Sequence, residues 1–393
     1  MRQRLFTPGP TQIPERVIVA MAQPFPYHRG PAFKKLFEEV ITGLQYVFQT
    51  QNEVLILTTS GTGGMEACVA NLLLAGQKVL VLTAGKFGER WQQVCRAYGL
   101  ETVTLEVPWG EAPRVDDVKN ILQVHRDLAA VFCTHSETST GVAMDVRAIS
   151  ELVHAHTEAL MIVDGITSVG VLPFFMDEWK IDVCVNGSQK GLMVPPGLAF
   201  VALSERALER FETQQRDETM QRRQLPRYYL DFSKAREAAR ERMTAWTPAI
   251  TLLMGLQESL RMIRETGLEN LWQHYARLAK SMRAGMTAIG LELFAKAPSD
   301  ALTAVKVPPG IDGRQFNEIL RTRFGVTVAG GQGALKGKIF RITHMGDYDH
   351  LDMLAAMAAV ELALKELGWR VEVGAGVAVM QKMFAAYGAE SII

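Results

Sequence analysis

The sequence predicts an α/β protein that has a mainly parallel sheet, followed by a smaller α+β domain. Between residues 54 and 203, short apolar stretches rich in Val, Ile and Leu alternate with stretches of helical period. This alternation is typical of a parallel sheet covered by helices on both faces. The pattern changes after a long helix predicted over 248–265, since fewer strands follow it. The expected parts are an N-terminal arm over 1–20, a large domain over 21–250, a small C-terminal domain over 251–375 and a tail over 376–393.

In chain order, the first expected element is an extended arm, because Pro8, Pro10 and Pro14 block regular pairing. A helix over 31–48 follows. The large domain then has predicted strands over 54–60, 78–85, 102–107, 129–136, 159–168, 182–188 and 198–203, and helices over 61–74, 87–99, 115–126 and 146–157. The charged region 204–242 is expected to be mostly helical. The small domain has predicted helices over 271–290, 313–325 and 351–368 and strands over 303–308 and 338–346, and the tail ends in an amphipathic segment.

Composition and charge argue against several classes of partner. Of the 393 residues 48% are hydrophobic, and 42 basic side chains balance 42 acidic ones. A neutral chain has no electrostatic footprint for nucleic acid or an anionic membrane surface. No apolar run is long enough to span a membrane, and prolines interrupt the N-terminus where a signal peptide needs an apolar run. The four cysteines form no CxxC pair and lie in apolar stretches. We therefore expect a cytoplasmic protein with no metal site, whose partners are small molecules or a second copy of the chain.

A lysine and an aspartate each follow or end an apolar strand, where α/β sheets bind their ligands. Lys190 lies between the strand predicted over 182–188 and the Pro-Pro-Gly at 195–197. By position alone, it is either a solvated loop cation or a functional amine. Asp164 ends an apolar strand, where a carboxylate is costly unless it is paired. It either caps the turn at Gly165 or faces a cationic nitrogen of a ligand.

Ser60, Gly61 and Thr62 open the helix that follows the first strand of the large domain. Hydroxyls and bare amides at a helix N-terminus form an anion site, and phosphate is its usual ligand. The alternative is an ordinary helix cap with flexible glycines. A phosphate cradle, a strand-end acid and a strand-end lysine together fit pyridoxal phosphate, with Lys190 as the Schiff-base lysine and Asp164 on the pyridinium nitrogen.

Three further side chains fit such a site. Phe87 lies between glycines, so that its ring can lie flat on a cofactor ring or simply pack in a loop. Ser139 belongs to the hydroxyl-rich stretch 136–141, which offers either contacts to a ring substituent or a helix cap. Arg341 alternates within an apolar strand, so its guanidinium needs an anion. That anion is a substrate carboxylate, held in bidentate fashion, or the partner in a structural ion pair.

Seven short motifs then give a family resemblance: PGPT at 8–11, SGTGGMEA at 60–67, THSETSTG at 134–141, VDGITS at 163–168, GSQKGL at 187–192, PPG at 195–197 and KIFRITHMG at 338–346. In this order they resemble class V aminotransferases of the alanine–glyoxylate and serine–pyruvate type. The resemblance implies the fold-type I architecture of pyridoxal-phosphate enzymes, with a seven-stranded, mainly parallel sheet in the large domain. It also implies a ping-pong transfer of an amino group between a small amino acid (alanine, serine or aspartate) and an oxo acid (glyoxylate, pyruvate or 2-oxoglutarate).

The resemblance also implies roles for individual residues. Lys190 would carry the cofactor, Asp164 would hold the pyridinium proton, Phe87 would stack on the ring and Arg341 would bind the substrate carboxylate. The other implied cofactor contacts are Ser60, Gly61, Thr62, Ser139, Ile166 and Gln189, together with Thr244 and Thr247, which would reach the cofactor phosphate of a partner subunit. The family therefore implies a homodimer with two shared sites.

Other functions are considered, because this chain differs from related enzymes at some positions and lacks some motifs. Cysteine desulfurases share this fold, but they carry histidines where this chain has Phe87 and Gln189, so a lyase or desulfurase is the alternative activity. A non-catalytic binding protein is a second alternative, and the intact site residues argue against it. A nicotinamide dehydrogenase lacks support because there is no dinucleotide fingerprint. Arg29 either accepts a second, distal carboxylate of a dicarboxylic substrate or pairs with a nearby acid such as Glu38 or Glu39.

Overall fold

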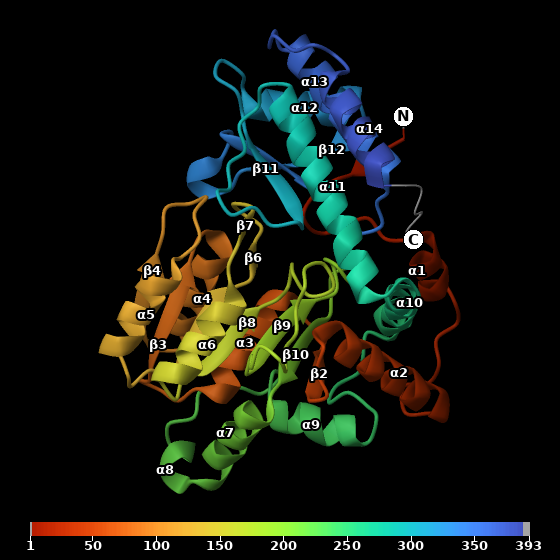
Figure 1. Ribbon diagram of the computed structural model, residues 1–393. Helices are drawn as coiled ribbons and strands as arrows, with labels where there is room; N and C mark the ends of the chain where they lie inside the picture. The colour runs from red at the N-terminus through yellow and green to blue at the C-terminus, as the bar shows by residue number, and fades with distance from the viewer. Residues whose placement is uncertain (1, 388–393) are drawn as a thin grey trace.

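The chain folds into two lobes that are joined by long helices (Figure 1). The computed structural model describes residues 2–387. The larger lobe is built on a seven-stranded sheet and the smaller one on a three-stranded sheet. Within the described part of the chain, no helix is long and apolar enough to cross a membrane.

The large sheet confirms the predicted seven-stranded, mainly parallel architecture. Its strands are β2 (Glu53–Leu57), β3 (Lys78–Thr83), β4 (Glu101–Glu106), β5 (Ala130–Thr134), β8 (Leu160–Asp164), β9 (Val183–Gly187) and β10 (Ala199–Leu203). They lie in the order β2-β10-β9-β8-β5-β3-β4, and only β10 runs antiparallel to its neighbours. The parallel strands therefore end at the same edge, where Asp164 lies between Thr134 and Val185.

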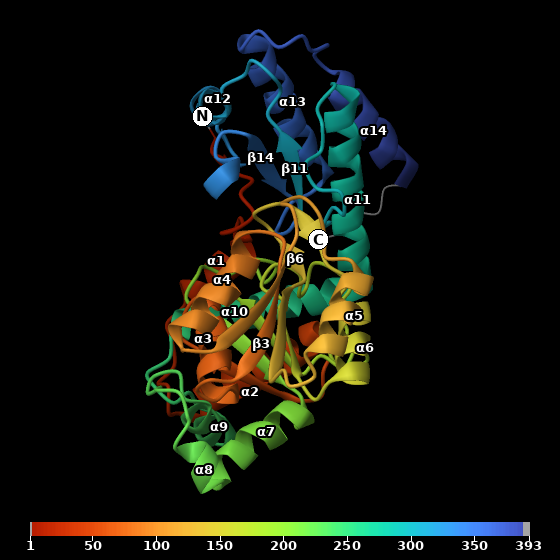
Figure 2. The same cartoon turned by 90° about the vertical axis from the view of Figure 1, so that its left-hand side faces the viewer.

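Helices cover both faces of this sheet, as Figure 2 shows nearly edge-on. One face packs against α2 (Pro31–Phe48), α5 (Val115–Val124), α6 (Val146–His156) and α10 (Ile250–Thr266), and the other against α3 (Gly61–Leu72), α4 (Lys86–Ala97), α7 (Glu205–Arg216) and α9 (Phe232–Arg240). Successive side chains of a strand point to opposite faces. In β3, Leu80 and Leu82 join the first core, whereas Val79 and Val81 join the second. Both faces are apolar because both are buried. All four cysteines are free and buried, as predicted.

The smaller lobe has the antiparallel order β11 (Leu302–Lys306), β14 (Ile339–Thr343) and β13 (Ala329–Gly330). Its helices are α11 (Leu268–Ala288), α12 (Gly313–Arg323), α13 (His350–Glu366) and α14 (Ala375–Tyr387), with the short 3-10 turn η1 (Gly333–Leu335). Most of the predicted tail is α14, whose Met380 is buried in the core of this lobe next to Gly285. The last residues of the tail, 388–393, lie outside the described residues. The predicted limits between the domains stay predictions.

The N-terminal segment connects the two lobes. Its strand β1 (Arg4–Leu5) pairs in parallel with β12 (Val326–Thr327) of the smaller lobe. After a turn, Thr11 hydrogen-bonds to the loop that follows β9, and α1 (Glu15–Met21) packs on α10. The remaining short elements are β6 (Ser136–Glu137) and β7 (Val142–Ala143), which form a hairpin, and α8 (Glu218–Gln221).

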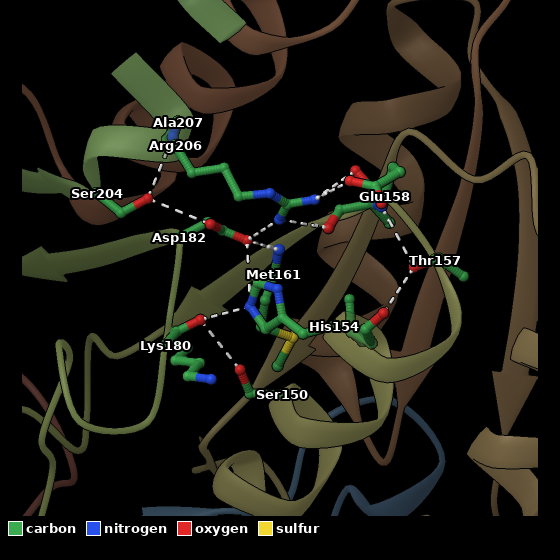
Figure 3. A network of polar contacts seen from close by, with 12 residues as sticks. Ser150, His154, Thr157, Glu158, Met161, Lys180, Asp182, Ser204, Arg206 and Ala207 are labelled. Carbon is green, nitrogen blue, oxygen red and sulfur yellow. Dashed lines mark hydrogen bonds and ion pairs between the residues drawn. The ribbon is translucent and has the colours of Figure 1, made fainter. Parts of the chain in front are cut away.

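A buried ion pair anchors the opposite end of β9 (Figure 3). Asp182 immediately precedes this strand, and its side chain is 3% exposed. One carboxylate oxygen accepts hydrogen bonds from the Arg206 guanidinium and the Met161 amide, both at 2.8 Å, and the other accepts one from Ser204. His154 lies 3.6 Å from the same carboxylate. The network fixes α6, α7 and the start of β9 to one another.

Candidate active site

A cavity of about 220 Å³ lies at the edge where the parallel strands end. All the predicted cofactor contacts line it except Ser139, Thr244 and Thr247. They meet there because each follows the carboxyl end of a neighbouring strand of the same sheet. A larger hollow of about 750 Å³ lies at the opposite edge, beside Lys78 and Arg206, away from these residues.

Lys190 is a buried amine, 8% exposed, so the alternative of a solvated loop cation is wrong. Its Nζ donates a hydrogen bond to the Pro8 carbonyl oxygen. Burial lowers the pKa of Lys190 from 10.5 to about 8, although the nearby Asp164 opposes this change. A substantial fraction of the amine is therefore neutral near pH 8, and the neutral form is the one that attacks a carbonyl carbon.

The N-terminal segment lies directly over this lysine. Thr11 donates two hydrogen bonds to the lysine loop, from its hydroxyl to the Lys190 carbonyl at 3.0 Å and from its amide to the Gln189 carbonyl at 3.2 Å. Gly9 has a φ of +115°, and a Cβ at this position would overlap the Lys190 Nζ. Only glycine fits there. The sequence contained a signal for this contact in the PGPT motif, but Pro8 and Gly9 were not predicted as site residues.

Asp164 is 3% exposed and faces the same cavity. One of its oxygens accepts a hydrogen bond from the Ile166 amide at 2.9 Å, so the carboxylate does cap the turn that follows β8. Burial raises the pKa of Asp164 from 3.8 to about 7, while Lys190 and Arg90 act in the opposite direction. A cationic nitrogen in the cavity would favour the ionised form of this carboxylate.

The start of α3 offers an anion cradle. Ser60 is its N-cap residue, yet its hydroxyl makes no capping hydrogen bond. The Gln189 Oε1 atom is buried and has no partner among residues 2–387. A Cβ on Gly61 would lie 2.5 Å from the Ile166 side chain, so only glycine lets these loops approach. The free Ser60 hydroxyl and the amides at the start of α3 are donors that fit a phosphate, whereas Gln189 fits it only through its side-chain NH₂ group.

Phe87 lies in the first turn of α4, and its ring faces the cavity. The ring centroid is 5.9 Å from the Lys190 Nζ and 4.8 Å from the Arg90 guanidinium carbon. Arg90 also donates a hydrogen bond to the Thr62 hydroxyl at 3.0 Å. Arg90 lines the cavity but was not predicted as a site residue. Its spacing of three residues from Phe87, on one helix face, was the available signal.

Ser139 does not line the cavity, and Ser136 does instead. The Ser139 hydroxyl donates to Glu137 at 2.6 Å and accepts from the Lys86 amide at 2.9 Å. It lies at the start of α4, behind the Phe87 backbone. The predicted contact of Ser139 with a cofactor ring stays a prediction.

Arg341 is 4% exposed in β14 and makes its hydrogen bonds to backbone carbonyls. Its Nη1 donates to the Thr138 oxygen at 2.6 Å, and its Nε and Nη2 donate to the Gly330 oxygen at 3.1 and 2.6 Å. Burial lowers the pKa of Arg341 to about 10, so the guanidinium remains charged at neutral pH. Across residues 2–387, no carboxylate forms an ion pair with it, so the alternative of a structural ion pair is wrong. The charge of Glu137 acts to raise the pKa of Arg341 without forming an ion pair with it, and the remaining N–H groups of the guanidinium can bind a ligand carboxylate.

Besides Ser139 and Arg341, three other predicted residues do not line the cavity. Thr244 donates its hydroxyl to the Trp246 carbonyl at 2.6 Å, and Thr247 is exposed. Arg29 is also exposed. Its two suggested partners pair elsewhere, Glu38 with Arg242 and Glu39 with Lys35 and Arg261.

The fold and the site together define a class. A buried lysine and a buried aspartate at neighbouring strand ends, beside an anion cradle, are the arrangement of fold-type I pyridoxal-phosphate enzymes. The sequence profile of the family "Aminotransferase class-V" matches residues 4–344. The chain belongs to this family.

Relatives and solved structures cover nearly all of the chain. It is 44% identical to the "soluble hydrogenase, small subunit" of Synechococcus sp. (strain PCC 6716), over 97% of this chain and 98% of the relative. It is 36% identical to the L-aspartate–glyoxylate aminotransferase of Paracoccus denitrificans (strain Pd 1222), over 97% of this chain and 96% of the relative. The crystal structure of ureidoglycine–glyoxylate aminotransferase from Bacillus subtilis superposes with a TM-score of 0.92 at 29% identity, covering 98% of both chains.

These findings confirm the prediction of an aminotransferase. A cysteine desulfurase from Thermococcus onnurineus NA1 matches with a TM-score of 0.71 but only 17% identity, which shows a shared fold alone. The desulfurase alternative therefore has no support beyond the fold. The described residues contain no group of three or more His, Cys, Asp or Glu side chains that could hold a metal ion.

Proposed function

We propose that this aminotransferase binds pyridoxal phosphate in the 220 Å³ cavity and transfers the amino group of a small amino acid to an oxo acid such as glyoxylate. The observation that carries the proposal is a buried, partly neutral Lys190 facing a buried Asp164 beside an anion cradle. The hydroxyl and amides at the start of α3 would hold the phosphate, the side-chain NH₂ group of Gln189 would donate to it, and Phe87 would cover one face of the ring. The buried amine, the buried carboxylate and the free groups at the start of α3 together fit pyridoxal phosphate.

When bound, the cofactor supplies an aldehyde that takes up the amino group and a ring that accepts electrons from the substrate carbon. Lys190, as a neutral amine, would remove the proton from the substrate Cα and deliver it to the cofactor carbon that bears the nitrogen. Asp164, as a carboxylate, keeps a proton on the ring nitrogen. Arg341 holds the substrate carboxylate with its remaining N–H groups, which orients the Cα–H bond.

The names of the relatives support most of the proposed substrates, though none of them names 2-oxoglutarate. Alanine, serine and aspartate are the proposed donors, and glyoxylate, pyruvate and 2-oxoglutarate the proposed acceptors. Aspartate and glyoxylate both appear in the name of the Paracoccus relative. Arg29 is exposed and could accept the distal carboxylate of a dicarboxylic substrate. Arg29→Ala should then lower kcat/KM for aspartate far more than for alanine, and equal effects on both would remove this role.

A homodimer is part of the proposal. Thr244 and Thr247 lie outside the cavity of their own chain, which supports a contribution to the site of a second copy. Light scattering of the purified protein tests this point, and an active monomer would contradict it. The cytoplasmic location stays a prediction.

Borohydride reduction in the presence of pyridoxal phosphate tests the central assignment. The reagent fixes the cofactor to the lysine that holds it, and peptide mass analysis should find the tag on Lys190. Lys190→Ala is the matched control and should remain untagged. A tag on any other lysine would contradict the assignment. Following the cofactor spectrum as single amino acids and oxo acids are added then identifies the substrate pair.

A further inference from the structure

A buried turn at 137–139 contacts both the segment that presents Phe87 and the guanidinium of Arg341. Glu137 is 0% exposed. Its Oε2 accepts hydrogen bonds from the amides of Phe87 and Gly88, at 2.9 and 3.0 Å. Its Oε1 accepts two from Ser139, one from the amide at 3.2 Å and one from the hydroxyl at 2.6 Å. The carboxylate therefore caps the first turn of α4, about 50 residues away along the chain.

These contacts suit an ionised carboxylate. Each oxygen of Glu137 meets two donors, and a protonated oxygen would place its hydrogen against one of these N–H or O–H groups. Burial raises the pKa of Glu137, whereas the hydrogen bonds from Ser139, Gly88 and Phe87 lower it. Hydrogen bonds to an ionised group are stronger than those between neutral groups, so the position of the Phe87 backbone is firmly set.

The same turn also contacts Arg341. The carbonyl oxygen of Thr138, the next residue, accepts a hydrogen bond from Arg341 Nη1 at 2.6 Å. The Ser139 hydroxyl, which donates to Glu137, accepts from the Lys86 amide at 2.9 Å. A shift of Glu137 would therefore move the start of α4 and the arginine together.

We propose that Glu137 is a positioning residue, whose carboxylate holds Phe87 over the cofactor ring and, through Thr138, keeps Arg341 in register with that ring. The inference rests on the proposed binding of pyridoxal phosphate. Glu137 itself does not line the cavity, so it acts through Phe87 and Arg341 rather than on the reacting atoms.

Glu137→Gln tests the inference, because glutamine keeps the shape but turns an NH₂ group toward two donors. The matched control is Glu89→Gln on α4, the helix that Glu137 caps, where the glutamate forms a half-exposed ion pair with Lys86. We measure the Kd for pyridoxal phosphate from quenching of tryptophan fluorescence in the cofactor-free protein, and then KM and kcat for alanine and glyoxylate. Since the two donors that face the NH₂ group lose their acceptor, Kd and both KM values should increase roughly 10-fold or more in Glu137→Gln. The control should match the parent.

The readouts separate this inference from the proposed function. A parent protein that fails to bind pyridoxal phosphate contradicts the proposed function. A parent that binds it, with a Glu137→Gln variant of equal Kd and KM, overturns the role of Glu137.

A double-mutant cycle with Phe87→Leu tests whether Glu137 acts through the ring. The combined increase in Kd should be smaller than the product of the two single increases, since both changes remove the same contact. An increase equal to the product would overturn the inference. If Glu137→Gln fails to fold, as judged from circular dichroism, Glu137→Asp replaces it in the cycle, because it keeps the charge and shortens only the reach.

Discussion

Asp164→Asn should make the cofactor-free protein more stable and the loaded enzyme nearly inactive. Burial raises the pKa of this carboxyl group from 3.8 to about 7 in the folded protein. Each pKa unit corresponds to about 1.4 kcal/mol, so ionised Asp164 costs the cofactor-free fold up to roughly 4 kcal/mol. The asparagine amide must also be buried, at a cost of about 1–3 kcal/mol. We therefore expect a net gain of about 1–3 kcal/mol in the free energy of unfolding at pH 8.

The gain should depend on pH in a defined direction. In the unfolded chain, the Asp164 carboxyl group ionises near pH 3.9, whereas in the fold it ionises near 7. Between these values the folded state holds a proton that the unfolded state has released, so the stability of the parent falls as pH rises. The side-chain amide of the Asp164→Asn variant cannot titrate. The advantage of the variant should therefore be absent near pH 4, grow toward pH 7 and stay constant above it.

Urea unfolding of both cofactor-free proteins, at one protein concentration and at about pH 4.5, 6 and 8, measures this difference. Asp182→Asn is the control, since Asp182 is equally buried but pairs with Arg206, and its loss should destabilise the fold. Turnover of the loaded variant should fall by about two orders of magnitude or more, because an amide cannot hold the ring proton. An advantage that does not change with pH, or near-normal turnover with bound cofactor, would refute the reasoning.

Three further outcomes are expected. Capture of pyridoxal phosphate by the cofactor-free protein should accelerate as pH rises through about 8, where Lys190 loses its proton, and a rate independent of pH in stopped-flow absorbance would contradict the lowered pKa. Arg341→Ala should raise KM for both the amino acid and the oxo acid about 10-fold or more, with an unchanged Kd for the cofactor; if only one substrate is affected in steady-state assays, the arginine serves a side chain instead. Asp182→Ala should destabilise the protein by about 1–3 kcal/mol, because the Met161 amide loses its buried acceptor and the partly exposed Arg206 guanidinium loses its carboxylate partner; no measurable loss in chemical unfolding would show that water replaces the carboxylate.

The alternation of apolar strands and helical stretches in the sequence was enough to predict the fold. Both faces of the large sheet are buried, so its strands are apolar throughout and easy to recognise. The strand predicted over 78–85 is β3, in which successive residues enter two different cores. The helix predicted over 31–48 has the observed limits of α2. Pro31 is a preferred first residue of a helix, and Gln49 ends it in a left-handed conformation with a φ of 54°.

The expectation that α/β sheets bind ligands at their strand ends identified Lys190 and Asp164, but it did not identify the residues that support them. Lys190 and Asp164 could be found because their position depends only on where two strands end. Glu137 could not, since its role depends on amides at 87 and 88, which only the folded chain brings to it. The same holds for Pro8, whose carbonyl reaches Lys190 from the other end of the chain. Local patterns identify which residues carry charge, whereas tertiary contacts decide what each charge faces.

The charges around the cavity explain why cofactor and substrate binding should stabilise this fold. Lys190, Arg90 and Arg341 face two carboxylates, Asp164 and Glu137, and burial lowers the pKa of the lysine and of Arg341 while it raises that of both acids. Lys190, Arg341, Asp164 and Glu137 therefore each carry their charge at a cost. A phosphate at the start of α3, a cationic ring nitrogen at Asp164 and a carboxylate at Arg341 would each supply the opposite charge where it is missing. Because a ligand that binds only the folded state adds its binding energy to stability, the fold that is costly without ligands becomes the favoured one when the site is filled.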